Sequence, residues 1–319
     1  MPQDESALSR RAALRCLAFG AAGTLFTLSG GVLVPEAVTA AELRMGEKQS
    51  HGKPLFVQLS DTHIGFHKDA NPDVVATLNS SIDLINSLPR RPAFALHTGD
   101  ITHLSKPAEF DTAAQLLARL SVSELHTVPG EHDVADAEVK EYFARFGAAS
   151  KNRGYYAFDH SGVHFIALIN VLQAKDGGAG YLGEDQLDWV RADLRGRTSS
   201  TPIVVFAHMP LWNVYEPWGW RTSDSDALFA ELRRFGSVTV LNGHIHQIAQ
   251  KVEGNITFHT ARSTAYPQPA PGEGPGPGPL KVPAGELARR LGITTVALHR
   301  HPLSLQPDDL LLAPANEHA

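Results

Sequence analysis

Short apolar runs alternate with amphipathic segments through most of this 319-residue chain, and this alternation limits the folds that it can adopt. The apolar runs have the length of single β-strands and lie at 55–59, 93–97, 124–128, 203–206 and 238–241. The segments between them have the spacing of helices with one apolar face, and lie at 74–88, 110–120, 184–194 and 227–235. Strands and helices in this order predict a layered α/β sandwich with one core.

Two further pairs of runs are separated by turn residues and predict β-hairpins. One pair flanks Ser161-Gly162 and the other flanks Gly254-Asn255. Residues 267–283 are dominated by proline and glycine, which indicates a loop or linker without a core of its own. In the segment 284–319, a short helix and two strands are expected to close the same domain.

The composition is that of a globular protein and argues against a nucleic-acid-binding surface. Hydrophobic residues make up 43% of the chain and charged residues 19%, with a mean hydropathy of -0.15. The formal net charge is -6, whereas a surface for nucleic acid would be basic. The chain has 16 histidines, more than packing requires, and this excess is the first indication of metal chemistry.

The first 41 residues have the three zones of an export signal. The pair Arg10-Arg11 precedes an uncharged stretch from Cys16 to Pro35, and small residues follow between Ala37 and Ala41. This order resembles a twin-arginine signal, with cleavage expected after Ala40 or Ala41. We then expect a periplasmic or secreted protein, with the twin-arginine export machinery as a partner and no stable membrane anchor. The alternative is an uncleaved anchor, since the stretch is nearly long enough to span a bilayer.

Cleavage at this point would remove Cys16, the only cysteine of the chain. The mature protein would have no thiol, so neither a disulfide nor a cysteine metal site is expected. The signal has one atypical position, because Ala13 stands where twin-arginine signals usually have a large apolar residue.

Polar side chains follow the expected strands in five places, each at the point where a strand ends. These motifs are Asp61-Thr62-His63, Gly99-Asp100, Gly130-Glu131-His132-Asp133, Ala207-His208 and Asn242-Gly243-His244-Ile245-His246. In α/β folds, the loops at the carboxyl ends of strands face one crevice, where ligands bind. The five loops are therefore expected to bring their acidic and histidine side chains into one pocket.

The residue types of these motifs suit a pair of metal ions. Imidazole and carboxylate groups bind Zn²⁺, Mn²⁺ or Fe, and the lack of thiolate excludes the usual structural zinc clusters. Seven ligands are too many for one tetrahedral ion and fit two ions that share a carboxylate. Two ions about 3.5–4 Å apart can clamp a phosphate ester for in-line displacement and generate hydroxide near neutral pH. The expected cofactor is therefore two metal ions, from Fe, Mn or Zn.

The order of the five motifs resembles that of the calcineurin-like metallophosphoesterases, over roughly Leu55 to His246. The resemblance implies an α/β/β/α sandwich with a single catalytic domain. It also implies hydrolysis of a small-molecule phosphate ester by a hydroxide that bridges two metal ions. The chain would then divide into an export signal (1–41), a metallophosphoesterase domain (42–266), the Pro/Gly-rich loop (267–283) and a closing segment (284–319).

If the family pattern applies residue by residue, seven side chains hold the metals and one assists the chemistry. The expected ligands of the first metal are Asp61, His63 and His246. The expected ligands of the second metal are Glu131, His208 and His244. Asp100 would bridge the two metals, and the catalytic residue His132 would steady the phosphate or protonate the leaving oxygen.

Glu131 departs from this pattern, because the family usually has asparagine at this position. With three carboxylates, two divalent ions and a bridging hydroxide would carry no net charge, whereas asparagine would leave a charge of +1. We expect Glu131 either to favour a trivalent ion such as Fe³⁺ or to weaken attraction for dianionic monoesters relative to monoanionic diesters. The alternative is that Glu131 points away and that water takes its place.

Three of the four tryptophans lie shortly after His208, namely Trp212, Trp218 and Trp220. The aromatic side chains of this stretch can have either of two roles. Trp212, Tyr215 and Trp218 can form a wall that stacks on an aromatic leaving group such as a nucleobase. Alternatively, these rings anchor their own loop. Tyr266, after the last hairpin, can also reach the phosphate. These four residues are the expected substrate contacts.

The remaining histidines, among them His97 and His126, are expected to have packing or surface roles. For His103, three residues after Asp100, a surface role is favoured over a place in the pocket. Asp133 is expected either to cap a helix or to orient a group of the site.

These observations favour a metal-dependent phosphoesterase, with diesters slightly ahead of monoesters. Hydrolysis of pyrophosphate-linked or phospholipid-type substrates is an alternative within the same class. A non-catalytic metal-binding scaffold on the same fold is an alternative of another class. The presence of His132, and of a suitable side chain at every metal position, disfavours that scaffold.

Overall fold

The computed structural model describes residues 24–29, 32–37, 54–134, 139–173, 178–283, 285–300 and 303–312. The chain forms two units, Met1–Gly52 and Lys53–Ala319. In the first unit, β1 (Thr24–Ser29) pairs antiparallel with β2 (Val32–Ala37). The arginine pair and the expected cleavage site lie outside the described residues. Among the residues that are described, no helix is both long and apolar enough to cross a membrane.

Parallel strands form the centres of two sheets in the second unit. In one sheet, the parallel strands are β3 (Pro54–Leu59), β4 (Phe94–His97) and β5 (Leu125–Thr127). In the other, they are β7 (Val163–Ala167), β8 (Ile203–Phe206), β9 (Val238–Asn242) and β11 (Ile256–Thr260). These strands therefore end at a common edge of each sheet, which is where the polar motifs lie.

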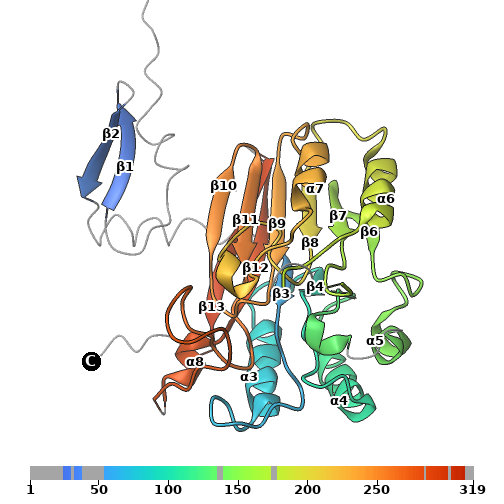
Figure 1. The fold of residues 1–319 in the computed structure, drawn as a ribbon, viewed down its shortest axis with the longest axis vertical. Coiled ribbons are helices and arrows are strands. Elements are labelled where there is room, and N and C mark those ends of the chain that lie inside the picture. Colours follow the sequence, from blue (N-terminus) through green and yellow to red (C-terminus); the bar gives the residue numbers. More distant parts are fainter. Residues whose placement is uncertain are drawn as a thin grey trace, which may run out of the picture. The chain divides into compact units, whose positions relative to one another are not determined.

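Antiparallel strands complete both sheets (Figure 1). They are β6 (Tyr156–His160), β10 (Gln250–Glu253), β12 (Gly292–Arg300) and β13 (Leu303–Leu311). The five-stranded sheet has the order β13-β12-β3-β4-β5, and the six-stranded sheet has the order β10-β11-β9-β8-β7-β6. Because β12 pairs with β3, the segment after the Pro/Gly-rich loop adds its strands to the sheet that begins the domain.

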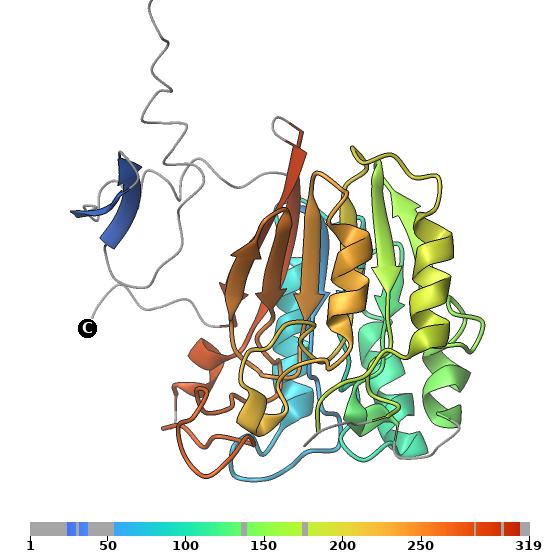
Figure 2. The ribbon, with the colours of Figure 1, turned by 45° about the horizontal axis from the view of Figure 1, so that its top comes forward.

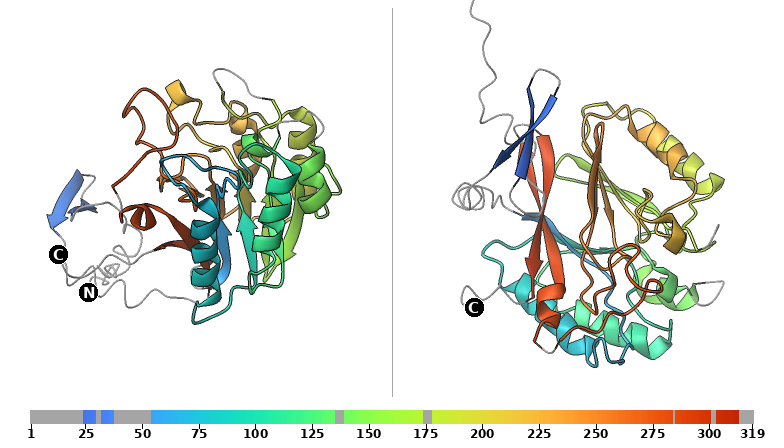
Figure 3. Two further views of the ribbon diagram at one scale, coloured as in Figure 1. Left: turned by 90° about the horizontal axis from the view of Figure 1, so that it is seen from below. Right: turned by 60° about the vertical axis from the view of Figure 1, so that its left-hand side comes forward.

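Helices cover the outer faces of the two sheets (Figures 2 and 3). The helices α3 (Val74–Asn86), α4 (Pro107–Leu117) and α5 (Lys140–Phe146) cover the five-stranded sheet. The helices α6 (Glu184–Leu194) and α7 (Ser225–Leu232) cover the six-stranded sheet. Shorter turns are η1 (Glu131–Asp133), η2 (Glu216–Trp218) and α8 (Leu287–Arg290). The architecture is the expected α/β/β/α sandwich.

The alternation of side chains along each strand divides the core into layers. In β3, Phe56 points into the space between the sheets, whereas Val57 and Leu59 face the helices. Phe56 stacks on Phe94 with ring centroids 5.2 Å apart, and Phe165 of the opposite sheet meets Phe56 edge-on at 5.5 Å. This aromatic contact joins the two sheets and fixes how their strand ends face one another.

Candidate metal centre

The five polar motifs lie in the loops that follow β3, β4, β5, β8 and β9. Asp61, His63, Asp100, His208 and His246 are at most 1% exposed, although all five come from loops. The other predicted residues of the centre are only partly buried, and they are Glu131, His132 and His244. Titratable groups so deeply buried are stable only when they are paired or when they bind a cation.

The side chains form two groups that share one carboxylate. In each group, the candidate ligand atoms lie within 4.8 Å of one another. The first group consists of Asp61, His63 and His246, and the second consists of Glu131, His208 and His244. Asp100 lies between the groups, with its Oδ2 atom 3.5 Å from Nε2 of His63 and 3.4 Å from Nε2 of His208. Two ligand sets joined by a carboxylate are suited to two metal ions.

Three buried atoms of the second group have no hydrogen-bond partner among the described residues, and this fits a cation. These atoms are Oε2 of Glu131, Nε2 of His208 and Nδ1 of His244. Glu131 lies 2.8 Å from His208 and 2.9 Å from His244, but the directions do not suit hydrogen bonds. A buried polar atom without a partner costs about 1–3 kcal/mol. A cation held by all three side chains would remove this cost.

Backbone carbonyl groups fix the orientation of two of the metal-site histidines. Nδ1 of His208 donates to the carbonyl of Thr98 at 2.7 Å, and Nδ1 of His246 donates to the carbonyl of Tyr266 at 2.6 Å. Each ring therefore has its proton on Nδ1 and leaves Nε2 available as a ligand. Partners of this kind raise the basicity of a histidine ligand and hold its ring in place.

The charge states of the buried groups also suit a metal centre. Burial, with three neighbouring imidazole rings adding to it, lowers the pKa of His63 well below its ordinary value, so this ring is neutral. Burial opposes charge on Glu131 and His208, but neighbouring groups of opposite charge outweigh it. The side chains of His244 and His208 hold the pKa of Glu131 well below its ordinary range, and the carboxylates of Asp100 and Glu131 hold the pKa of His208 well above its ordinary value. A metal ion would displace the proton from His208.

The loops carry their ligands on strained backbone. Five of the seven candidate ligands have a positive φ, namely Asp61 (54°), His63 (41°), Asp100 (52°), His244 (69°) and His246 (55°). This left-handed region is uncommon for residues other than glycine and costs about 1–3 kcal/mol per residue. Such strain persists only where the surrounding structure holds it. Here the packed loops hold the side chains of the candidate ligands close together.

Asp133 ties two of the loops together. Its carboxylate accepts hydrogen bonds from the main-chain N–H groups of Ile101 (2.9 Å), Thr102 (2.8 Å) and Gly130 (3.0 Å). The hydroxyl of Thr102 donates to the same carboxylate at 2.8 Å. Asp133 thus caps the η1 turn and also fixes the loop that carries Asp100, so it has both of the roles that the sequence suggested.

His97 supports the metal centre by contacting two of its loops, whereas its sequence context indicated only a packing role. Burial lowers the pKa of His97 to about 3, so the ring is neutral. Its Nδ1 accepts the N–H of Gly99 at 3.2 Å, and its Nε2 lies 3.2 Å from the hydroxyl of Thr62. Because Thr62 donates to the carbonyl of Ile101 at 2.8 Å, one ring links the first two motif loops.

His103 lies in the pocket, so the favoured surface role was wrong. Its Nδ1 atom is 3.4 Å from Nδ1 of His63, and its ring stacks on His132 with centroids 4.8 Å apart. Burial and the neighbouring His132 lower the pKa of His103 to about 4. Its position three residues after Asp100 was the only signal in the sequence.

The aromatic residues that were expected to contact substrate have different surroundings. Trp212 is 7% exposed and packs against Phe258, so its ring belongs to the core. Tyr215 and Trp218 are partly exposed and meet edge-on with centroids 5.3 Å apart. Tyr266 is buried and stacks on the metal-site ring of His63 at 4.8 Å. Trp212 is therefore not placed to contact substrate, whereas the roles of Tyr215, Trp218 and Tyr266 as substrate contacts stay predictions.

The Pro/Gly-rich segment lies beside the second ligand group. It forms a loop that the N–H of Leu280 closes by donating to the carbonyl of Pro267 at 2.8 Å. The side-chain amide of Gln268 donates to the carbonyl of His244 at 2.9 Å. This segment is therefore attached to the motif that carries His244 rather than forming a free linker.

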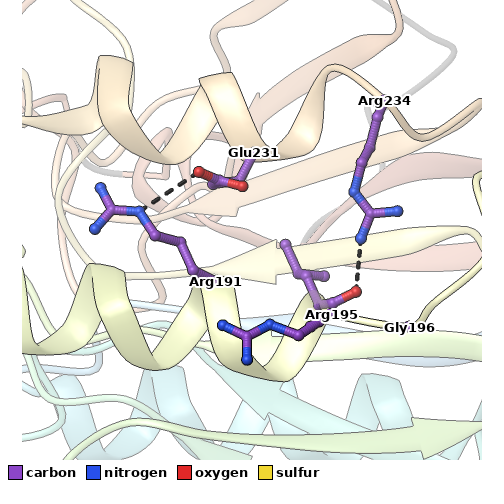
Figure 4. Close-up of a pocket in the computed structure, with 6 residues that line it drawn as sticks. Arg191, Arg195, Gly196, Glu231 and Arg234 are labelled. Carbon is purple, nitrogen blue, oxygen red and sulfur yellow. Dashed lines mark hydrogen bonds and ion pairs between the residues drawn. The ribbon is translucent and has the colours of Figure 1, made fainter.

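A separate hollow of about 410 Å³ lies at α6 and α7, and Figure 4 shows its lining residues. Arg191 contacts Glu231 at 3.4 Å, and Arg234 donates to the carbonyl of Leu194 at 2.6 Å (Figure 4). Cations near the carboxyl end of a helix compensate its free carbonyl groups. None of the predicted site residues lines this hollow.

The sandwich and its two ligand groups around a shared aspartate define a binuclear metallohydrolase. The Calcineurin-like phosphoesterase family profile matches residues 54–248, and the chain belongs to this family. It is therefore a metal-dependent phosphoric ester hydrolase with two metal ions.

Known proteins of similar sequence and structure agree with this assignment. The chain is 28% identical over 231 residues to the "Glycerophosphodiester phosphodiesterase GpdQ" of Enterobacter lignolyticus, covering 66% of this chain and 78% of the relative. It is 26% identical over 226 residues to a "Probable cyclic nucleotide phosphodiesterase" of Rhodopseudomonas palustris, with the same coverage. Among solved structures, a dimetal phosphatase from Danio rerio has the same fold, with a TM-score of 0.62 and 15% identity, over 82% of this chain and 97% of that one.

Replacing Gly130 with alanine is expected to disrupt the metal centre. A Cβ atom at this position would collide with the carboxylate and the main-chain nitrogen of Asp100. Metal content measured by plasma mass spectrometry should fall from about two ions per chain to about one or fewer. Gly236→Ala is the matched control, since the nearest atom to its Cβ would be 3.6 Å away. Full metal content in Gly130→Ala would show that the position of Asp100 does not limit metal binding.

Proposed function

We propose that the enzyme is an exported phosphodiesterase whose binuclear centre favours monoanionic diesters over dianionic monoesters. The observation that carries this proposal is the place of Glu131 in the second ligand group, where its two oxygens lie 2.8 and 2.9 Å from His208 and His244. These distances support a glutamate that takes part in the centre over one that points away.

The donor set proposed for the metals is the one that the motifs predicted. Asp61, His63 and His246 form one set, and Glu131, His208 and His244 form the other. Asp100 is proposed as the shared ligand. When bound, two metal ions in such a centre lower the pKa of water and neutralise charge that develops on the phosphoryl oxygens.

The number of carboxylates determines how strongly the centre attracts anions. Three carboxylates offset all but one of the four positive charges that two divalent ions bring, whereas asparagine at position 131 would leave two. A unit charge about 4 Å away is worth about 4 kcal/mol at an effective dielectric constant of 20. The lower charge reduces attraction for a dianion more than for a monoanion, and therefore favours diesters.

The names of two relatives support the same preference for diesters. The two bacterial proteins of similar sequence are named as a glycerophosphodiester phosphodiesterase and a cyclic nucleotide phosphodiesterase, and both names describe diester hydrolysis. They support diesters as the class of substrate for this enzyme.

His132 is proposed to serve the leaving group. Its main-chain N–H donates to Oδ1 of Asp100 at 2.9 Å, and its Nδ1 donates to the carbonyl of His103 at 2.7 Å. These two bonds fix the ring and leave Nε2 for the ester oxygen. A ring held in this way can donate a proton to the departing alkoxide, or a hydrogen bond to the phosphate.

We further propose that residues 1–41 direct the folded enzyme through the twin-arginine machinery. The arginine pair before an uncharged stretch, and the small residues at its end, support this proposal. The enzyme would then act on substrates outside the cytoplasm, and the catalytic domain would begin after Ala40 or Ala41.

The first test compares bis(p-nitrophenyl) phosphate with p-nitrophenyl phosphate. The mature protein should contain about two metal ions and hydrolyse the diester with the higher kcat/KM. In His132→Ala, kcat for the diester should fall by about 10²–10⁴ while metal content stays unchanged. Bound metal without turnover of either ester, with several added metals, would favour the scaffold alternative.

Glu131→Asn is expected to change the substrate preference toward monoesters. The additional positive charge should raise the ratio of monoester to diester kcat/KM by about tenfold or more. Glu253→Gln, an exposed charge on β10, is the control and should leave the ratio unchanged. If the ratio and the metal content of Glu131→Asn both equal those of the unmodified enzyme, the charge argument fails.

Replacing Arg10 and Arg11 with lysine should retain the enzyme in the cytoplasm as a full-length precursor. Arg15→Lys, outside the pair, should be exported normally. Cell fractionation gives the location, and sequencing of the mature amino terminus should find Ala41 or Glu42 first. An exported double variant would contradict the twin-arginine route, and an uncleaved membrane-bound protein would favour the anchor alternative.

A further inference from the structure

His103 contacts a proposed metal ligand, His63, and the proposed catalytic residue, His132, although it belongs to neither ligand group around Asp100. It follows β4 in the loop that carries Asp100 and is partly buried. Its main-chain N–H donates to the carbonyl of Ile64 at 2.9 Å, which ties this loop to the first motif loop. Phe66 meets its ring edge-on, with centroids 5.2 Å apart and an interplanar angle of 89°. The contact with Phe66 therefore helps to hold the ring of His103 in place.

The first contact of the His103 side chain is with a proposed metal ligand. The Nε2 atom of His63 faces the centre, 3.5 Å from Oδ2 of Asp100. The Nδ1 atom of His63 lies 3.4 Å from Nδ1 of His103. A histidine that binds metal through Nε2 has its remaining proton on Nδ1, so His63 is the donor and His103 the acceptor of this hydrogen bond.

The second contact is with the proposed catalytic histidine. The ring of His103 stacks on that of His132 with centroids 4.8 Å apart and an angle of 16° between the planes. The carbonyl of His103 accepts the Nδ1–H of His132 at 2.7 Å. The hydroxyl of Ser105, two residues further on, donates to the carbonyl of His132 at 2.8 Å. The same loop thus fixes the main chain, the ring plane and the tautomer of His132.

We propose that His103 is a positioning residue that orients the metal ligand His63 through its Nδ1 atom and the catalytic residue His132 through its ring. This inference rests on the proposed function, because it takes His63 as a ligand and His132 as the group that serves the ester. It assigns two separable tasks to one side chain. The hydrogen bond acts on metal affinity, and the ring stack acts on turnover.

Two variants separate these tasks. His103→Phe keeps a flat ring against His132 and Phe66 but removes the acceptor for His63. His103→Asn keeps an acceptor atom at the position of Nδ1 but removes the ring. The backbone carbonyl that binds His132 is present in both variants. His160→Phe, which replaces a partly exposed histidine of β6, is the control.

The experiment uses the mature enzyme, stripped of metal and titrated with Mn²⁺ by calorimetry. Turnover of bis(p-nitrophenyl) phosphate is then measured at saturating Mn²⁺. In His103→Phe, the affinity for one of the two Mn²⁺ ions should fall by about 10- to 100-fold, while kcat at saturation changes by less than about threefold. In His103→Asn, the affinity should be nearly unchanged while kcat falls by about tenfold at a similar KM.

Each outcome distinguishes the inference from the function on which it rests. If the unmodified enzyme binds no Mn²⁺ and hydrolyses neither ester, both proposals are overturned. If it binds two ions and turns over, but both variants behave like the control, the role of His103 alone is overturned. Equal losses of affinity and turnover in the two variants would also overturn it, since they would indicate a general disturbance of the loop. Circular dichroism checks that each variant is folded.

Discussion

The position of the Asp100 carboxylate is the constraint on which the rest of the centre depends. Its Oδ2 atom faces a histidine of each ligand group, and its Oδ1 atom accepts the main-chain N–H of His132. The next loop can approach this closely only because Gly130 has no side chain. Asp133 then holds the two loops together with four hydrogen bonds. One buried carboxylate therefore sets the spacing of both proposed metals and the place of the ring of His132, the proposed catalytic residue.

This arrangement is costly without a cation, and the rigid sandwich is what maintains it. Several charged or polar groups are buried together, and five ligands have strained backbone conformations of about 1–3 kcal/mol each. The aromatic contact between the sheets, from Phe56 and Phe94 to Phe165, lies beneath the loops and fixes the strand ends from which they start. Metal binding would compensate part of this cost, so the stability of the fold and the occupancy of the centre should be linked.

Much of this structure followed from the sequence, because strand ends and their polar residues are local features. The expected bounds of 184–194 and 203–206 are those of α6 and β8, and the motif residues converge as expected. The helix α5 was not expected, since seven residues are too few to show a helical period. The supporting roles of His97 and His103 were missed for another reason. Such roles depend on contacts between loops that are distant in the chain, and spacing within one motif does not report them.

The two ligand groups differ in exposure, and this difference explains where an additional carboxylate can be accommodated. The first group is at most 1% exposed, whereas the side chains of Glu131 and His244 are 33% and 13% exposed. Desolvating a further charge in the first group would cost several kcal/mol, but the second group lies close enough to water to reduce that cost. The Pro/Gly-rich loop borders this same side through Gln268 and the carbonyl of His244. Under the proposed function, the additional charge of Glu131 and the Pro/Gly-rich loop therefore both act at the more exposed second group, whereas the first group and Asp100 are shielded from water.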